Sequence, residues 1–374
     1  MSSPAAPAAG AVSHLYVHLP FCVSRCGYCA FVVEVGALDR RDAYLEALLA
    51  ELESERHRLG PLMSVFLGGG TPTLMRPARL GRLMERVRPL LAPGAEVTAE
   101  ANPETVDRAG FDALLAMGVT RVSLGVQSFQ PHVLDALDRR ATPDQSREAI
   151  ACARRAGFRD IGIDLLFGVP GQSPADMQRD LDEAMAAGPD HLSWYELELK
   201  PGSALARRGT APVDEDEAAD AYRWAVESLE RAGYRWYETA NFARPGHECV
   251  HSLAYWGAAD YLGIGVGAVS TVGGHRWRNA PGLSRYIDAL GRGETPPRTG
   301  ERLDADDIRR ERWMLGLRLQ EGLRRSWAGP PDHPEAVESL ARAGLLRHDE
   351  ETVVLTREGR FVQNAILHRL MEYA

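Results

Sequence analysis

The chain has 374 residues, of which 45% are hydrophobic and 25% are charged, and its 52 acidic and 43 basic residues give a net charge of −9. This composition is typical of globular proteins. At about 150 residues per domain, the length allows about two and a half domains or one large α/β barrel with an appendage. The acidic balance argues against nucleic acid as a partner, because phosphates are bound by concentrated positive charge.

The first eleven residues, MSSPAAPAAGA, are small and predict a disordered N-terminus. They lack the basic start and the apolar core of a secretory signal. No apolar run in the chain approaches the roughly 20 residues that span a bilayer. We therefore expect a cytoplasmic protein.

Short β-rich runs alternate with longer amphipathic helical patterns over residues 12–235. The predicted strands cover residues 14–19, 64–67, 96–101, 121–126, 160–166 and 191–197. The predicted helices between them cover residues 39–58, 77–91, 105–117, 143–156 and 174–187. Six βα units in series require a parallel sheet with right-handed crossovers. The pattern thus predicts an α/β fold, a partial (β/α)6 barrel with its site at the carboxyl ends of the strands.

Three of the five cysteines, Cys22, Cys26 and Cys29, stand at C-x3-C-x2-C spacing directly after the first predicted strand. Five cysteines are too few for a disulfide scaffold and fit a reduced compartment with a metal site. Three thiolates can ligate three irons of a [4Fe–4S] cluster and leave the fourth iron open to a non-protein ligand. Structural zinc sites normally have four ligands, and this spacing without a nearby fourth Cys or His argues against zinc. The alternative is a Cys3His zinc site that includes His18, four residues before Cys22.

This spacing resembles the signature of the radical S-adenosylmethionine (SAM) superfamily, in which a partial barrel carries the cluster loop after its first strand. Motifs after the later predicted strands strengthen the resemblance: GGGTPT at 68–73, EANP at 100–103, GVQSF at 125–129 and DLLFGVP at 164–170. Together they resemble the branch related to oxygen-independent coproporphyrinogen III oxidase. The resemblance implies a [4Fe–4S] cluster on the three cysteines and SAM as a second cofactor.

The resemblance also implies which residues contact SAM: Tyr16, Tyr28, Gly69, Gly70, Thr71, Glu100, Gln127, Arg139 and Asp164. The chemistry of these residues suits the ligand. Glycines at a strand end expose backbone groups that can hydrogen-bond the methionine part of SAM. Side chains such as Glu100 can accept hydrogen bonds from ribose hydroxyls or the ammonium group, and Arg139 can pair with the carboxylate.

An aromatic and glycine-rich segment, residues 236–290, follows the βα units, and we interpret it as completing the core. Within it, Gly263, Gly265 and Gly267 form G-x-G-x-G. That pattern differs from the dinucleotide motif G-x-G-x-x-G, and no βαβ unit surrounds it. The resembling family carries a similar glycine-rich segment near the adenine of SAM.

Residues 251–256 read H-S-x-x-Y-W, and they resemble the H-N-x-x-Y-W marker of the heme chaperone subgroup, the HemW-like proteins, with Ser252 in place of Asn. This resemblance favours His251 as an axial heme ligand. Tyr255 and Trp256 then offer flat apolar surface to the macrocycle. A packed histidine–aromatic corner is the structural alternative. Two further candidate ligands stand nearby: His247 and Cys249.

The stretch 291–300 contains two consecutive prolines and predicts a linker to a C-terminal domain over residues 300–374. Residues 346–348 and 353–355 form a predicted two-stranded wing, so this domain resembles a small α+β winged helix. A winged helix can read DNA, but the acidic wing tip at 349–351 repels phosphate. We therefore expect the wing to pack or to contact a partner.

Two departures distinguish this chain from the coproporphyrinogen decarboxylase of the same branch. That enzyme carries a further cysteine two positions after the third cluster ligand, and a longer segment before the motif. Here that position is Phe31, and only 21 residues precede Cys22. We therefore interpret the chain as a heme chaperone that binds heme, a [4Fe–4S] cluster and SAM. It delivers heme to client proteins, with membrane-associated respiratory proteins among the candidates.

Two enzymes are the alternative interpretations. One is an oxygen-independent coproporphyrinogen III dehydrogenase, and the other is a related radical SAM methyltransferase. A reductant such as flavodoxin or ferredoxin is an expected partner only if SAM is cleaved.

Overall fold

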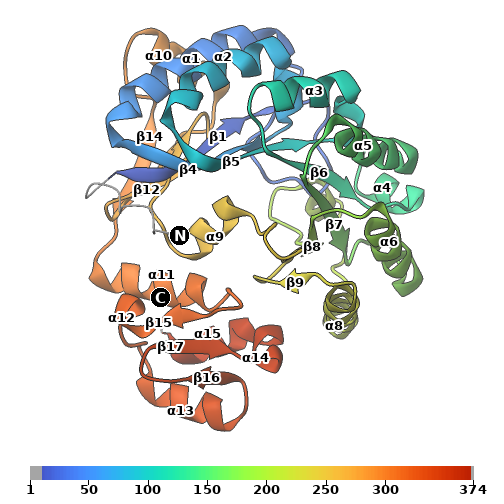
Figure 1. Cartoon of the computed structure of the whole chain (residues 1–374), viewed down its shortest axis with the longest axis vertical. Coiled ribbons are helices and arrows are strands. Elements are labelled where there is room, and N and C mark those ends of the chain that lie inside the picture. Colours follow the sequence, from blue (N-terminus) through green and yellow to red (C-terminus); the bar gives the residue numbers. More distant parts are fainter. Residues whose placement is uncertain (1–10, 372–374) are drawn as a thin grey trace.

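The structure is a computed structural model of the chain, and it describes residues 11–371 (Figure 1). The predicted disordered N-terminus, residues 1–11, lies outside the described residues except for residue 11. Within the described part, the largest sheet has nine strands in the order β11-β1-β4-β5-β6-β7-β8-β10-β9. Six of them are parallel and follow chain order: β1 (Val12–Leu19), β4 (Leu59–Gly69), β5 (Leu91–Ala101), β6 (Arg121–Gln127), β7 (Asp160–Phe167) and β8 (His191–Glu196).

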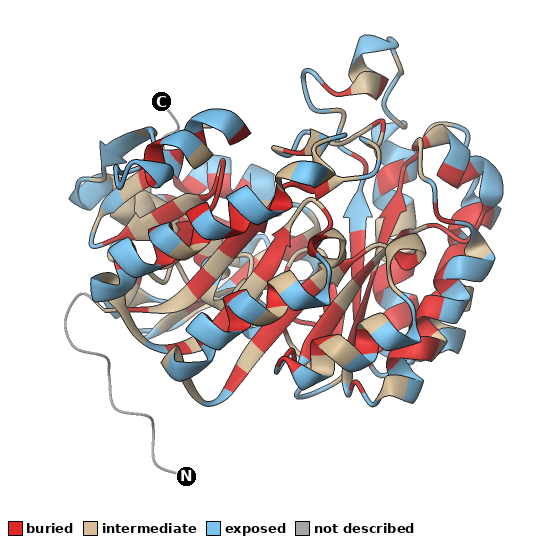
Figure 2. Ribbon diagram, turned by 90° about the horizontal axis from the view of Figure 1, so that it is seen from above, coloured by how far each residue is buried: buried red, intermediate tan, exposed pale blue. Residues whose placement is uncertain are grey.

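These six parallel strands confirm the predicted partial barrel. Helices connect the strands and cover the outer face of the curved sheet (Figure 1). They are α1 (Arg41–Glu55), α2 (Pro77–Val87), α3 (Arg108–Ala116), α4 (Pro131–Ala136), α5 (Pro143–Ala156), α6 (Pro174–Ala187) and α8 (Glu215–Arg231). Buried residues concentrate on the strands and on the helix faces that pack against them, whereas exposed residues lie on the outer helix faces (Figure 2).

Local capping signals place the ends of the helices. The side chain of Thr142 accepts a hydrogen bond from the backbone of Gln145 and forms a capping box at the start of α5, and Ser173 forms the same kind of box for α6. Both helices end at a glycine in the left-handed region, Gly157 with φ +110° and Gly188 with φ +64°. The local sequence therefore determines where α5 and α6 begin and end.

Strand alternation separates a helix-facing side from a cavity-facing side. In β5, Val97 and Ala99 are fully buried in the core shared with the helices. Thr98 and Glu100 alternate with them and line an internal cavity. The pairing register then places Glu100 opposite Ser123 of β6. Polar side chains from successive strands are thereby collected inside the barrel.

Residues 236–290 extend the sheet at both edges, which the sequence pattern does not predict. β11 (Leu262–Ile264) joins β1 in parallel, whereas β10 (Asn241–Ala243) pairs antiparallel with β8 and with β9 (Arg235–Trp236). Strands of two or three residues are too short to show a period in the sequence. The helix α9 (Val250–Trp256) lies between these edge strands in the chain.

A separate antiparallel sheet corrects the linker prediction. It consists of β12 (Val269–Val272), β13 (His275–Asn279) and β14 (Arg298–Arg302). Residues 298–300 of the predicted linker therefore belong to a strand. The reason is tertiary: Arg298 forms ion pairs of 3.0 Å with the buried Glu51 and 2.7 Å with Glu55, both on α1. The helix α10 (Leu283–Gly291) precedes this strand.

The C-terminal part has its own hydrophobic core, distinct from that of the barrel. The predicted wing forms, with β16 (Leu346–His348) antiparallel to β17 (Thr352–Leu355) and β15 (Leu323–Arg324) as a third strand. The helices around it are α11 (Ala305–Gly316), α12 (Arg325–Ala328), α13 (Pro334–Arg342), α14 (Arg357–Phe361) and α15 (Gln363–Leu370). This arrangement agrees with the predicted α+β winged-helix-like fold.

Arg360 fastens the C-terminal part to the barrel. Its guanidinium donates hydrogen bonds to the backbone oxygens of Trp236 (2.7 Å) and Glu238 (3.1 Å), and it lies 3.5 Å from the centre of the Trp236 ring. Burial lowers the pKa of Arg360 to about 10. A buried cation with two backbone acceptors and an aromatic face holds the two parts together.

Candidate functional site

A cavity of about 550 Å3 runs inside the barrel from the cysteine loop to the amino ends of β6 and β8. Ten of the thirteen residues predicted from sequence line it: Cys22, Cys26, Cys29, Tyr28, Gly69, Gly70, Glu100, Gln127, Arg139 and Asp164. Tyr16 and Thr71 lie just behind the lining. The ring of Tyr16 stacks on the cavity residue Phe66 at 6.2 Å between centroids, and the hydroxyl of Thr71 lies 3.7 Å from the Cys22 sulfur. The remaining predicted residue, His251, does not line this cavity.

The cysteine loop is closed by a short parallel pair, β2 (Phe21–Cys22) with β3 (Glu34–Val35). Inside the loop, the backbone N–H of Gly27 donates a 2.9 Å hydrogen bond to the carbonyl of Leu137. A Cβ atom at Gly27 would lie 2.7 Å from a carboxylate oxygen of Asp138. A larger residue at this position would have to displace the Asp138 side chain, so glycine suits the close approach of the loop to the helical segment after β6.

The three thiols share a partly buried environment. Burial raises the pKa of Cys22 to about 11, and it also raises the pKa of Cys29. A guanidinium nitrogen of Arg139 donates to the Cys26 sulfur at 3.5 Å. Without a bound metal the thiols of Cys22 and Cys29 therefore keep their protons at neutral pH, and a metal or cluster must displace those protons when it binds.

The geometry does not favour a single zinc ion. Both ring nitrogens of His18 are engaged, one with the hydroxyl of Tyr16 at 3.1 Å and the other with the carbonyl of Val32 at 2.8 Å. Within residues 11–371, no three side chains of His, Cys, Asp or Glu are gathered closely enough to hold one metal ion. Three thiolates that each bind a different iron stand farther apart than ligands of one ion, so the loop fits a cluster better than zinc.

Two carboxylates line the cavity wall on either side of β6, Glu100 on β5 and Asp164 on β7. Burial, together with the nearby charge of Asp164, raises the pKa of Glu100 to about 7; burial also raises the pKa of Asp164. Asp164 accepts hydrogen bonds from the hydroxyls of Ser193 (2.7 Å) and Ser123 (3.2 Å). Glu100 accepts one from the backbone of Gly69 (3.1 Å). A buried acidic pair without an ion-pair partner in the described chain suits a ligand with a positive charge, and SAM carries an ammonium and a sulfonium.

Arg139 provides the opposite charge on the cavity wall. It donates to the side chain of Asn102 at 3.1 Å and to the carbonyl of Gly125. Its Nε is fully buried and has no hydrogen-bond partner in the described chain. An unpaired buried guanidinium donor fits an anionic group such as the carboxylate of SAM. The cavity residues thus fit both ends of the methionine part of this cofactor.

The helix α9 places His251 against β4 and not in the cavity. The Nδ1 of His251 forms a 2.8 Å hydrogen bond with the hydroxyl of Ser64, and its ring lies 5.2 Å from that of Phe66. Burial lowers the pKa of His251 to about 4, so the imidazole is neutral at physiological pH. On the same helix, Tyr255 is 47% exposed. Cys249 and Ser252 face the cavity instead.

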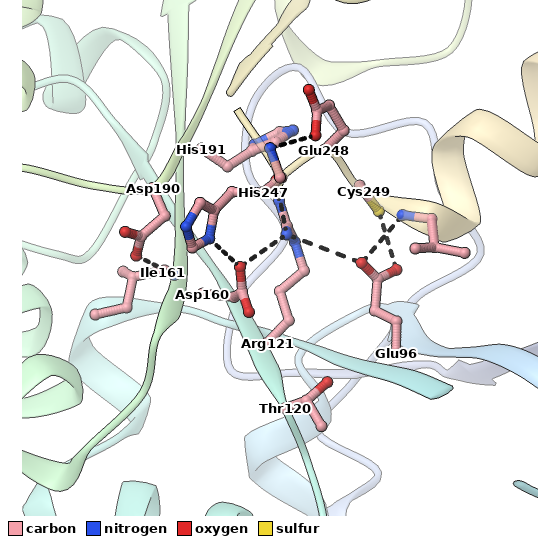
Figure 3. A network of polar contacts seen from close by, with 12 residues as sticks. Glu96, Thr120, Arg121, Asp160, Ile161, Asp190, His191, His247, Glu248 and Cys249 are labelled. Atoms are coloured by element: carbon pink, nitrogen blue, oxygen red, sulfur yellow. Dashed lines mark hydrogen bonds and ion pairs between the residues drawn. The ribbon is translucent and has the colours of Figure 1, made fainter. Parts of the chain in front are cut away.

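Buried charges hold the start of α9 (Figure 3). The carboxylate of Glu96 accepts hydrogen bonds from the backbone N–H groups of Val250 (3.0 Å) and His251 (3.1 Å), and the Cys249 sulfur donates to it at 3.4 Å. Arg121 lies 3.8 Å from Glu96 and donates to the carbonyl of residue 247. Glu96 therefore caps this helix from a distant part of the chain, because the capping position, Cys249, has no side-chain cap.

The same network engages the alternative heme ligands. The Nδ1 of His247 pairs with a carboxylate oxygen of Asp160 at 2.5 Å. The thiol of Cys249 is bonded to Glu96, and burial raises its pKa to about 11. Both histidines of this segment have an engaged Nδ1, that of His247 bonded to the charged Asp160 and that of His251 bonded to the neutral Ser64, and His251 is the one that belongs to the H-S-x-x-Y-W motif.

Replacing Glu96 by alanine is expected to lower the free energy of unfolding by roughly 3 kcal/mol. The change removes a carboxylate partner of the buried Arg121 and also removes the cap of α9. Urea unfolding followed by circular dichroism measures this loss. The matched control is Glu46→Ala, which removes an exposed carboxylate that pairs with Arg82 at 2.8 Å. We expect the control to unfold with nearly the stability of the parent protein. Equal unfolding midpoints for the two variants would contradict the capping role of Glu96.

Comparison with known proteins identifies the family. The model of the radical SAM superfamily matches residues 16–184. Heme chaperone HemW of Mycobacterium tuberculosis (strain ATCC 25618 / H37Rv) is 39% identical, and the match covers 98% of this chain and 96% of that protein. The chain belongs to the HemW family. Heme chaperone HemW of Bacillus subtilis (strain 168) is 31% identical over 94% of this chain and 97% of its own length.

The fold of this HemW family member also matches a solved structure. Coproporphyrinogen III oxidase from Escherichia coli, a radical SAM enzyme, superposes with a TM-score of 0.85 at 26% identity and covers 98% of this chain and 91% of its own. Membership of the radical SAM superfamily implies a [4Fe–4S] cluster and SAM as cofactors, and the cavity residues fit both.

Four residues that hold α9 in this HemW family member were missed by sequence reasoning: His14, Ser64, Glu96 and Arg121. Each is the first residue of a predicted strand. A polar residue at the start of a strand was the available signal, but the strand alone does not say which distant segment the polar atom meets.

Proposed function

We propose that this protein is a heme chaperone with two separate sites. The barrel cavity holds a [4Fe–4S] cluster on Cys22, Cys26 and Cys29, with SAM on the predicted contact residues. The helix α9 holds heme through His251 and gives it up to a client protein. The observation that carries this proposal is the separation of the sites: the cysteines open into the cavity, whereas His251 packs on β4 outside it.

The residues of the cavity support the cofactor assignment through their charge. Glu100 and Asp164 are arranged to face a positive group, and Arg139 is arranged to face a negative one. A cluster held by three thiolates supplies one iron with an open coordination position when it is bound. Gly69, at φ +106°, lets the chain pass close to His18, because a Cβ there would lie 2.4 Å from the imidazole. The glycine therefore keeps its backbone N–H directed at Glu100.

The surroundings of His251 support heme binding. Its Nδ1 forms a hydrogen bond with Ser64. Its Nε2 has no hydrogen-bond partner among the described residues, and it is not among the fully buried atoms that lack a partner. An accessible nitrogen with a lone pair is the atom that an axial heme ligand offers. The exposed ring of Tyr255 on the same helix supplies apolar surface for a macrocycle.

The partners follow from this proposal. Recipients are heme-receiving client proteins, and membrane-associated respiratory proteins are the candidates to test first. A flavodoxin or ferredoxin is needed as reductant only if SAM is cleaved. We propose a cytoplasmic location; across residues 11–371 no helix is both long and apolar enough to cross a membrane.

One sample tests the whole proposal. The purified protein is reconstituted anaerobically with iron and sulfide, titrated with heme, and then incubated with SAM and dithionite. We expect a saturable heme Soret band together with cluster absorption, and transfer of the heme to membrane vesicles that contain apo-respiratory proteins. A protein that assembles the cluster but takes up no heme would refute the chaperone function.

Conversion of coproporphyrinogen III by this protein is expected to be absent, even with SAM and reductant supplied. Phe31 stands where the decarboxylase carries a further cysteine, and its side chain is 67% exposed at the cavity rim. Anaerobic incubation followed by porphyrin chromatography measures the product, with the Escherichia coli coproporphyrinogen III oxidase as positive control. Stoichiometric protoporphyrinogen would instead identify an enzyme, and S-adenosylhomocysteine in the same chromatogram would identify a methyltransferase.

A further inference from the structure

Ser64 bridges two histidines from different parts of the chain. Its hydroxyl oxygen lies 2.9 Å from Nδ1 of His14 and 2.8 Å from Nδ1 of His251. His14 on β1 stands directly opposite Ser64 on β4 in the strand register. The two imidazole rings lie edge to face, with centroids 6.4 Å apart. The three side chains form one continuous hydrogen-bonded chain.

The single hydrogen of the Ser64 hydroxyl limits which nitrogens of His14 and His251 can carry protons. A serine hydroxyl has one hydrogen, so Ser64 donates to one imidazole and accepts an N–H from the other. A neutral imidazole carries its proton on one nitrogen only. If His251 donates from Nδ1, its Nε2 has a lone pair and His14 accepts from Ser64; if the order is reversed, Nε2 of His251 carries the proton. The direction of the Ser64 hydroxyl is therefore coupled to the tautomers of the two rings.

We infer that Ser64 and His14 are positioning residues that hold His251 with its proton on Nδ1 and present Nε2 to the heme iron. The inference rests on the proposed function, since it concerns the ligand of the same heme. Among the arrangements in which Ser64 donates to one of the two rings, only His251 Nδ1–H to Ser64 with Ser64 O–H to His14 leaves the lone pair on Nε2. This arrangement would let Nε2 hold heme iron while both hydrogen bonds of Ser64 are kept.

The environment of the bridge supports this role. Ser64 is fully buried, so its hydroxyl is shielded from bulk water. The amino end of α9 is held by Glu96 through the backbone of His251, which fixes where the imidazole emerges. Metal-bound histidines commonly donate their second N–H to a fixed acceptor, and this donation orients the ring and strengthens the metal–nitrogen bond. Here a serine backed by a second histidine is that acceptor.

The test compares four variants of the full chain: Ser64→Ala, His14→Phe, His14→Gln and His251→Ala. Heme affinity is measured by Soret titration, and the iron–histidine stretch of the ferrous complex by resonance Raman. We expect Ser64→Ala to weaken heme binding about 10 to 100-fold and to lower the stretching frequency. His14→Phe should change both quantities in the same direction. His14→Gln should restore them, because an amide oxygen can accept from Ser64.

A matched control separates this effect from loss of a buried hydroxyl in general. Ser146→Ala removes an equally buried serine hydroxyl on α5 that has no hydrogen-bond partner among the described residues. We expect it to leave heme affinity and the stretching frequency unchanged. Iron and sulfide content and the unfolding midpoint are measured for every variant, so that a folding defect is recognised.

The outcomes distinguish the inference from the function on which it rests. If His251→Ala loses the iron–histidine band while Ser64→Ala and His14→Phe keep the affinity and the frequency of the parent, the positioning role is wrong and the chaperone proposal stands. If His251→Ala itself binds heme with an unchanged spectrum, the proposed ligand and the positioning role are both wrong. Parallel losses in Ser64→Ala and His14→Phe, with recovery in His14→Gln, support both.

Discussion

Replacement of Cys26 by alanine is expected to remove nearly all cluster iron and sulfide while the barrel stays folded. Each of the three thiols in the loop supplies one iron ligand, and no other cysteine can take the vacant place. Cys152 lies on α5, where its sulfur donates to Glu148. Cys249 is bonded to Glu96 in β5, four residues before Glu100. Four residues of a strand span about 13 Å, so Cys249 lies far from the loop at the carboxyl ends.

Iron and sulfide analysis after anaerobic reconstitution, with circular dichroism for the fold, measures the effect. Cys152→Ala is the matched control, because it removes a thiol of the same chain away from the cavity, and it should keep the full cluster. We expect Cys22→Ala and Cys29→Ala to behave like Cys26→Ala. A normal cluster in any of these three variants would show that the ligand set is wrong.

Replacement of His251 by alanine is expected to lower heme affinity by at least 10 to 100-fold and to shift the Soret band. Loss of a partner that only supports a ligand already has that effect on metal affinity, and loss of the ligand itself removes a direct bond. Cluster content should not change, since His251 packs on β4 and does not line the cavity that holds the cysteines. Heme titration and iron analysis on the same preparation measure the two quantities separately.

A second histidine of the same segment provides the control for this experiment. His247→Ala removes an imidazole that is paired with Asp160, four positions before the proposed ligand. We expect it to keep the heme spectrum of the parent protein. If His251→Ala keeps the spectrum and His247→Ala loses it, the iron is bound by His247 and the assignment of the ligand is wrong.

The partial barrel could be predicted because its signals are local. Alternation along each strand, Pro at the helix starts and Gly at the helix ends all act within a few residues, as at Gly157 and Gly188. The cysteine loop could be predicted for the same reason, since Cys22, Cys26 and Cys29 lie within eight consecutive positions. The edge strand β11 was missed because three residues are too few to show a period.

The sequence by itself determined the α/β class, the cluster loop and the segment that carries His251. The tertiary structure alone decided what surrounds that histidine, because the partners come from distant strands: Ser64 lies 187 positions away and Glu96 lies 155 positions away. Their meeting depends on the register of β1 with β4 and on the docking of α9 across the sheet. Hydrogen bonds between such positions require the folded sheet, and no local pattern in the chain encodes them.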